Sequence, residues 1–168
     1  MAYIGQYEFI GPVDATDPCY TADERGRQGL GVTNIPLVPG LYFGYAIVDP
    51  DHNRISHLVV IQADLVEIYG GNPLDALEFL DKTEIGDIDV DSGCAGIFQD
   101  LPDFDPNVDL YTWPEIASMI LRAGKFTVLE WGFVSDSGWG DGSYPVYVYT
   151  NGAGETVACA IDYLVDRD

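Results

Sequence analysis

The chain has 168 residues, of which 28 are acidic and 7 are basic, so its formal net charge is −21. Apolar residues make up 47% of it, which excludes the low-hydrophobicity kind of intrinsic disorder and predicts a single globular domain over residues 1–168. No stretch approaches the roughly 20 apolar residues that span a bilayer, and the first residues lack the basic flank of a signal peptide. We therefore expect a cytoplasmic or virion-associated protein that makes no membrane contact.

The first third of the chain predicts three strands. One strand is expected over residues 3–10, ended by a Gly-Pro pair, and an irregular polar loop is expected over 14–30. Residues 40–48 and 55–63 flank the sequence DPDHNR, in which Asp, Pro and Asn favour a turn. These two segments therefore predict a β-hairpin.

Two helices and further strands follow. Pro after Asn and leucines at helical spacing predict a short helix over residues 72–82, and a capping-box pattern ended by Gly predicts a second over 112–124. Residues 125–134 predict one strand, while 144–150 and 155–165 predict a closing hairpin around the turn NGAG. The expected fold class is therefore α+β, with a mainly antiparallel β-sheet or open barrel and two short helices.

The acidic excess has three explanations. Acids scattered singly over the surface suit a protein adapted to high salt, where screening suppresses their mutual repulsion. A mimic of nucleic acid needs acids in a row, because duplex DNA carries one charge per about 1.7 Å of its axis. A calcium-loaded protein concentrates its acids in loops of defined spacing. The acids occur in every segment, which favours the first explanation, and their excess argues against direct nucleic-acid binding by a basic face.

The stretch GDIDVDSGCAG has the alternating acids of a calcium loop, at Asp87, Asp89 and Asp91. An EF-hand loop requires Gly at its sixth position and Glu at its twelfth, where this chain has Ser92 and Phe98. Apolar residues between the acids predict a half-exposed strand instead. A metal site of another type stays open as the alternative.

The segment SDSGWGDGSYPVY is rich in glycine and contains Asp136 and Asp141. It has neither the Lys-Ser/Thr of a P-loop nor the strand and helix of a dinucleotide-binding turn. We expect a bulged hairpin connection with Trp139 and Tyr144 folded over it. The alternative is a metal site of Asp91, Asp136 and Asp141, with a divalent cation such as calcium as the only cofactor considered.

The cysteines and histidines give no strong catalytic signature. Cys159 lies on the apolar face of a predicted strand and is expected to be a buried thiol, and no two cysteines have the spacing of a zinc site. His52 lies in a predicted turn, and His57 is expected to be partly buried on the strand face of Ile55. A dyad of Cys19 with His57 is the weak alternative, so no catalytic residue is assigned.

Three stretches of the chain occur in the order found in a known family. They are DPCY at 17–20, DSGCAGIF at 91–98, and SGWGDGSYPVYV from 137 onward, followed by the closing hairpin. Together they resemble a family of bacterial and phage proteins of unknown function that carries D-P-C-Y, D-S-G-x-A-G and G-x-G-D-G-x-Y-P-V. The resemblance implies no mechanism, but it implies a common feature at Asp17, Cys19, Asp91, Gly93, Gly96, Gly138, Gly140, Asp141, Gly142 and Tyr144.

These observations favour a non-enzymatic binding or assembly protein with a salt-adapted acidic surface, from a virus or mobile element of a halophilic host. Its partner would be a protein, either a second copy or a host protein, because exposed aromatic residues anchor interfaces. One alternative is a metal-dependent module or hydrolase that uses Asp91, Asp136 and Asp141 near Cys19. Another is an acidic nucleic-acid mimic that inhibits a DNA-binding host protein. The predicted binding residues are Cys19, Asp91, Tyr111, Trp113, Trp139, Asp141 and Tyr144.

Overall fold

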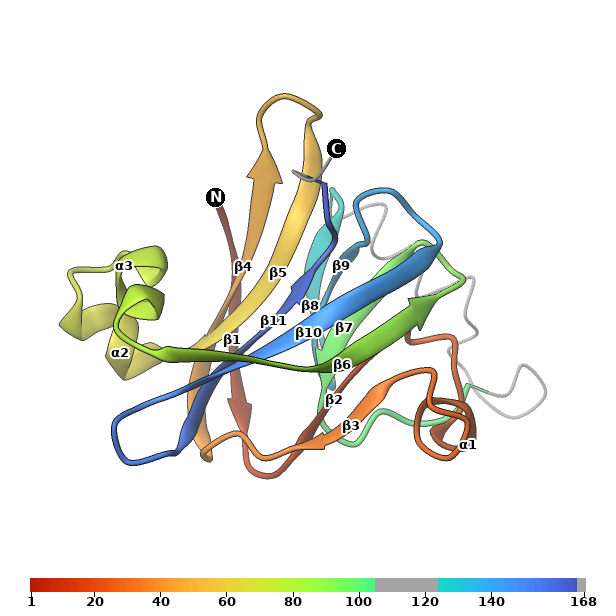
Figure 1. The fold of residues 1–168 in the computed structure, drawn as a ribbon, viewed down its shortest axis with the longest axis horizontal. Coiled ribbons are helices and arrows are strands. Elements are labelled where there is room, and N and C mark those ends of the chain that lie inside the picture. Colours follow the sequence, from red (N-terminus) through yellow and green to blue (C-terminus); the bar gives the residue numbers. More distant parts are fainter. Residues whose placement is uncertain (105–123, 166–168) are drawn as a thin grey trace.

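Two antiparallel sheets packed face to face make up the fold (Figure 1). The structure is a computed structural model that describes residues 1–104 and 124–165. All strand pairings within the two sheets are antiparallel. The predicted mainly antiparallel sheet with short helices is thereby confirmed, although helices form only a small part of the described chain.

The first sheet has six strands, in the order β1-β4-β5-β11-β10-β6. The predicted hairpin around DPDHNR is present as β4 and β5, and the predicted closing hairpin is present as β10 and β11. The predicted half-exposed acidic strand is the second half of β6. The bounds are Ala2–Phe9 for β1, Gly40–Asp49 for β4, Arg54–Gln62 for β5, Asp81–Val90 for β6, Gly142–Thr150 for β10 and Thr156–Asp162 for β11.

The second sheet has five strands, in the order β3-β2-β7-β9-β8. The single strand predicted over 125–134 is wrong, because Glu130 and Trp131 form a two-residue turn between β8 and β9. Neither residue is of the kind that favours tight hairpin turns, so the residue pattern favoured a continuous strand. The bounds are Val13–Thr16 for β2, Val32–Ile35 for β3, Cys94–Phe98 for β7, Phe126–Leu129 for β8 and Gly132–Asp136 for β9.

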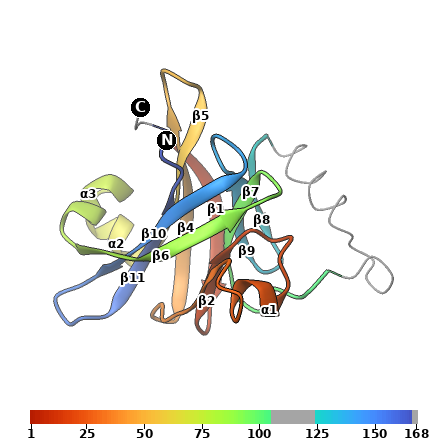
Figure 2. The ribbon, with the colours of Figure 1, turned by 45° about the vertical axis from the view of Figure 1, so that its right-hand side comes forward.

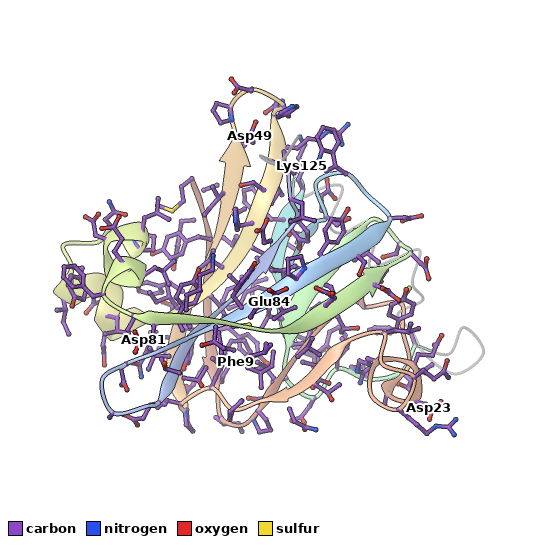
Figure 3. The ribbon with its side chains drawn as sticks, in the orientation of Figure 1. Phe9, Asp23, Asp49, Asp81, Glu84 and Lys125 are labelled. Atoms are coloured by element: carbon purple, nitrogen blue, oxygen red, sulfur yellow. The ribbon has the colours of Figure 1, made fainter. Side chains whose placement is uncertain are left out.

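The main hydrophobic core lies between the two sheets and takes side chains from both. Phe9, labelled in Figure 3, lies at the centre of an aromatic group, with its ring centroid 5.4 Å from that of Tyr42 and 6.0 Å from that of Phe133. Cys159 is fully buried in this core, as predicted. Strand β1 lies beside β8 and β3 beside β6, so the sheets approach each other along both sides.

Three short helices are described: α1 (Ala22–Arg25), α2 (Ala63–Ile68) and α3 (Pro73–Glu78). α3 confirms the helix predicted over 72–82 with shorter bounds, and the helix predicted over 112–124 falls almost wholly outside the described residues. Figure 2 shows α2 and α3 on the side of the first sheet that faces away from the second. There they cover a second, smaller core on the outer face of β4, β5 and β11. None of the helices described is long and apolar enough to cross a membrane.

The irregular loop predicted over 14–30 is wrong in part, because it contains most of β2 and all of α1. The Thr21 side chain accepts a hydrogen bond from the Glu24 N–H, and the Glu24 side chain accepts one from the Thr21 N–H. This capping box is a pattern that the sequence does contain, as T-x-x-E. It fixes the first turn of a helix only four residues long.

Candidate functional site

The carboxylate of Asp17 connects two stretches that lie far apart in the sequence. Asp17 directly follows β2 and is fully buried. It accepts hydrogen bonds from the N–H groups of Asp91 and Ser92, both at 2.8 Å, and from the Ser92 hydroxyl at 2.7 Å. It also accepts one from the N–H of Cys19 at 2.8 Å. The DPCY stretch is therefore attached to the chain between β6 and β7.

Tyr20 adds a second connection between these two stretches. Its hydroxyl donates to the carboxylate of Asp91 at 2.6 Å. Cys19 lies beside this pair, and burial together with the Asp17 carboxylate raises the pKa of its thiol. A thiol held protonated is a poor nucleophile at neutral pH, so the surroundings of Cys19 oppose a catalytic role.

The glycine-rich segment 137–141 joins β9 of the second sheet to β10 of the first. The hairpin connection predicted for it is therefore wrong, because a hairpin joins neighbouring strands of one sheet. The N–H of Ser137 donates to the carbonyl of Gly93 at 3.0 Å, and the Tyr144 hydroxyl donates to the carbonyl of Gly140 at 2.9 Å. Tyr144 does fold over the segment, whereas Trp139 is 47% exposed.

The three stretches DPCY, DSGCAGIF and SGWGDGSYPVYV thus meet at one end of the two sheets. Gly142, the first residue of β10, pairs with Val90, the last residue of β6. Asp141 and Asp91 are therefore the next residues beyond this pair, one on each chain segment. Gly96 pairs with Thr16 on one side and with Val134 on the other. Backbone pairing and the Asp17 hydrogen bonds bring these positions together.

The three carboxylates proposed as metal ligands occupy different surroundings. Asp91 is bonded to Tyr20, Asp141 is exposed beside the start of β10, and Asp136 is half-buried at the end of β9. Within residues 1–104 and 124–165, no three His, Cys, Asp or Glu side chains are arranged so that they hold a metal ion.

A pocket of about 250 Å³ opens beside this end of the molecule. The β4–β5 turn contributes His52 and Asn53, and β5 contributes Arg54 and Ile55. The other wall comes from the second sheet and the crossing segment, with Lys125, Asp136 and Gly138. Figure 3 shows Asp49 of β4 and Lys125 near the same end of the ribbon.

Arg54 is held by contacts with the crossing segment. One guanidinium N–H donates to the carbonyl of Gly138 at 2.7 Å, and the guanidinium carbon lies 4.6 Å from the centre of the Trp139 ring. His52 packs edge-on against the same ring, with centroids 5.3 Å apart, while its Nδ1 lies 2.9 Å from a carboxylate oxygen of Asp49. The turn and the crossing segment thus order each other's side chains.

Lys125 and Asp136 form the other side of the pocket. The Lys125 ammonium donates to the carbonyl of Asn53 at 3.1 Å, and its own carbonyl accepts from the Asp136 N–H at 2.8 Å. Burial raises the pKa of Asp136, and the charge of Lys125 offsets part of this rise. The pocket therefore presents both signs of charge, and the carboxylate in it is partly desolvated.

The remaining predicted residues lie elsewhere. Tyr111 and Trp113 fall outside the described residues. His57 is partly buried, as predicted, with its ring Nδ1 2.9 Å from the Ser56 hydroxyl and its Nε2 3.5 Å from a carboxylate oxygen of Asp162. It does not share the face of Ile55, because the register of β5 with β4 skips one residue between them.

Sequence reasoning missed Arg54 and Lys125. A signal was present, because basic residues are so rare in this chain that the position of each one is informative. The sequence alone does not show the packing of the first sheet against the second that brings residues 53 and 125 into contact.

The fold and the pocket define a two-sheet β protein with a pocket of mixed charge. Comparisons of the chain with protein-family models, with curated proteins and with solved structures gave no match.

Proposed function

We propose that the chain is a non-enzymatic binding or assembly protein whose acidic surface suits high salt. The observation that carries this proposal is the position of the acids. Among the described residues, only Asp17 and Asp162 are buried acids. Figure 3 labels Asp23 on α1, Asp49 at the tip of β4 and Asp81 on β6, at three separate parts of the molecule.

The state of the thiols supports a non-enzymatic role. Burial raises the pKa of Cys94 and of Cys159 to about 12 each, and that of Cys19 is raised as well. All three thiols are therefore protonated at neutral pH, and none of them is prepared as a nucleophile.

The spacing of the acids argues against the nucleic-acid mimic. β6 carries four acids over its ten residues, and a strand rises about 3.3 Å per residue. This spacing is several times wider than the one charge per about 1.7 Å of duplex DNA. The metal-dependent alternative is tested by the metal arms of the experiment below.

An exposed aromatic residue supports the binding part of the proposal. Trp139 is 47% exposed, yet its ring is fixed by contacts with Arg54 and His52. A rigid aromatic side chain anchors a protein interface at low entropic cost. Membership of the bacterial and phage family is part of the same proposal, supported by the contacts between its three motif stretches.

The charge part is tested by thermal unfolding of the full chain in a sodium chloride series, with calcium, magnesium and EDTA arms. Salt adaptation predicts a gradual rise in Tm up to molar salt, with no further effect of EDTA. A large rise in Tm at micromolar calcium, reversed by EDTA, would show a metal-loaded protein instead.

The assembly part is tested by sedimentation velocity at molar salt over a concentration series. We expect concentration-dependent association that Trp139→Ala weakens. The matched control is Leu74→Ala, which removes an exposed apolar side chain from α3. Equal sedimentation of both variants and the natural chain would reject self-assembly through Trp139.

A further inference from the structure

We propose that the pocket between the β4–β5 turn and residues 136–138 binds a small zwitterion, a free α-amino acid, with Arg54 binding its carboxylate and Asp136 binding its ammonium group. This site goes beyond the proposed protein-binding function, because it takes a small molecule and does not depend on a protein partner.

The pocket holds an unusual share of the rare cations. Arg25 and Arg27 are engaged in ion pairs with neighbouring acids, and Lys82 lies over the ring of Tyr147. Arg54 and Lys125 both line the pocket, and neither forms a salt bridge with a carboxylate in the described part of the chain. On a surface with a large excess of acids, two cations that form no salt bridge among the described residues, with only the charge of Asp136 in the same pocket acting on Lys125, mark a place for a negative group.

Arg54 is prepared for a carboxylate. Its guanidinium is held against Trp139 and donates one hydrogen bond, to the carbonyl of Gly138. Within residues 1–104 and 124–165, its other N–H groups have no acceptor. A fixed planar guanidinium binds a carboxylate through two parallel hydrogen bonds and loses little entropy in doing so.

Asp136 distinguishes a zwitterion from a simple anion. Its carboxylate lines the same pocket, is half-buried, and has the Cys94 thiol, at 4.0 Å, as its side-chain hydrogen-bond donor. A simple anion in this pocket meets a negative charge, whereas an ammonium group compensates the desolvation of that charge. A ligand with both groups therefore satisfies both walls.

The size of the pocket fits this ligand class. A sphere of 250 Å³ is about 8 Å across. In an α-amino acid the carboxylate and ammonium groups are separated by one carbon atom, and hydrogen bonds of about 2.8 Å at each end bring the protein groups to a similar separation. The Trp139 ring contacts Arg54 and His52 of the pocket wall and offers a surface for the ligand's side chain.

The test is isothermal titration calorimetry of the full chain at constant ionic strength. The probes are glycine, leucine and glutamate, with acetate, methylamine and inorganic phosphate as single-charge comparisons. We expect saturable binding of at least one amino acid, with acetate and methylamine weaker by at least about tenfold. Acetate or phosphate binding as tightly as the best amino acid would overturn the proposal, and so would the absence of saturable binding by all three amino acids.

Variants assign the two contacts. Arg54→Gln and Asp136→Asn are each expected to weaken amino-acid binding by at least about tenfold, and Asp136→Asn is expected to leave acetate binding unchanged or tighter. Arg27→Gln is the matched control, because Arg27 is an exposed arginine paired with Asp23 on α1. Unchanged amino-acid binding by Asp136→Asn would overturn the assignment.

Lys125→Gly serves if Arg54→Gln fails to fold. Lys125 has φ of 85°, in the left-handed region that glycine adopts without strain, so this variant removes a cation and relieves the backbone. We expect weaker amino-acid binding with no loss of Tm, and unchanged binding would count against the site. Failure of the amino-acid titrations leaves the salt series unaffected, because that series measures stability without a ligand.

Discussion

At the scale of single residues, the buried Asp17 carboxylate determines the geometry of one end of the molecule. It satisfies three backbone N–H groups and one hydroxyl, from Cys19, Asp91 and Ser92. Buried donors that lose their acceptor keep the full cost of desolvation. One side chain thereby extends the contact of β2 beyond its backbone pairing with β7, to the chain between β6 and β7.

Asp17→Ala tests this role through stability. Hydrogen bonds to charged groups contribute about 1.5–3 kcal/mol each, and several donors are left without acceptors, so we expect a loss of about 3–5 kcal/mol. Urea unfolding followed by circular dichroism measures the change, with Asp23→Asn as the exposed control. If both variants lose the same free energy of unfolding, water must accept the hydrogen bonds that the Asp17 carboxylate accepts in the natural chain.

Asp136 gives a prediction about pH. Burial raises the pKa of Asp136 in the folded protein, so its protonated form favours folding and its charged form opposes it. The stability that comes from the protonated form is therefore lost as the pH rises through the pKa of the folded protein. Asp136→Asn should therefore be more stable than the natural chain at pH 7, and this gain should vanish below the ordinary carboxyl pKa of 3.8.

Asp49 supplies a control of opposite sign. Hydrogen bonds from the backbone and side chain of His52 lower the pKa of Asp49, so its charged form favours folding. Asp49→Asn should be less stable than the natural chain at pH 7, and the difference should disappear in acid. Urea midpoints across the pH range measure both variants, and a shift of the same sign for both would contradict the assignment.

At the scale of elements, the segment between β9 and β10 joins the two sheets, and Gly138 allows the chain to pass. Gly138 has φ of 66°, and a Cβ atom there would lie 2.6 Å from the carbonyl oxygen of Ile55 and from a methyl group of Val165. Gly140 also has a positive φ, but a Cβ atom there would meet nothing within 4 Å. Substituting alanine at Gly140 therefore adds backbone strain alone, whereas at Gly138 it adds both backbone strain and steric overlap.

Gly138→Ala should cost about 3 kcal/mol of stability, from strain and overlap together. Gly140→Ala should cost about 1 kcal/mol, from strain alone. The free energies of urea unfolding of the two variants and the natural chain test this difference. Equal costs would show that the segment moves to make room at Gly138.

The sequence predicted those elements whose pattern and turn residues agree. The β4–β5 and β10–β11 hairpins have alternating or continuous apolar runs around turns rich in Asp, Asn, Pro and Gly. The β8–β9 hairpin was missed because its turn is Glu130-Trp131. The strand β2 was missed because it has only four residues and is stabilised by pairing with β7 and β3.

The candidate site was predictable only in part. The motif stretches that carry Asp17, Asp91 and Gly93 were selected through the family resemblance, and the structure places them in contact. The pocket of Arg54 and Lys125 depends on how the turn of the first sheet meets the edge of the second. That relation is a property of the tertiary packing, and no local pattern encodes it.

At the scale of the whole molecule, the net charge of −21 means that the acidic side chains repel one another. The described ion pairs neutralise only a few of these acids. Arg25 is buried and bound to the carbonyls of Tyr20 and Leu101 as well as to Asp14, so it serves the local structure around α1. Mobile cations must therefore supply most of the screening, within a Debye length of about 10 Å at 0.1 M salt. Stability should depend on ionic strength more than on any single pair.

Neutralising two exposed acids should therefore stabilise the protein at low salt. Asp81→Asn with Glu84→Gln removes two charges from the exposed half of β6, where neither acid forms a salt bridge within the described residues. We expect a Tm higher than that of the natural chain by a few degrees at low ionic strength, because the variant folds against less repulsion.

The same double variant should lose its advantage at molar salt, where the Debye length falls to about 3 Å and the natural chain is screened as well. Thermal unfolding of both proteins across the salt series measures the convergence. Thr83→Ala, an uncharged change between the two sites, controls for altered strand propensity. A difference in Tm that stays constant from low to molar salt would mean that the acids of β6 act through local contacts, and the proposed salt adaptation of the surface would lose its physical basis.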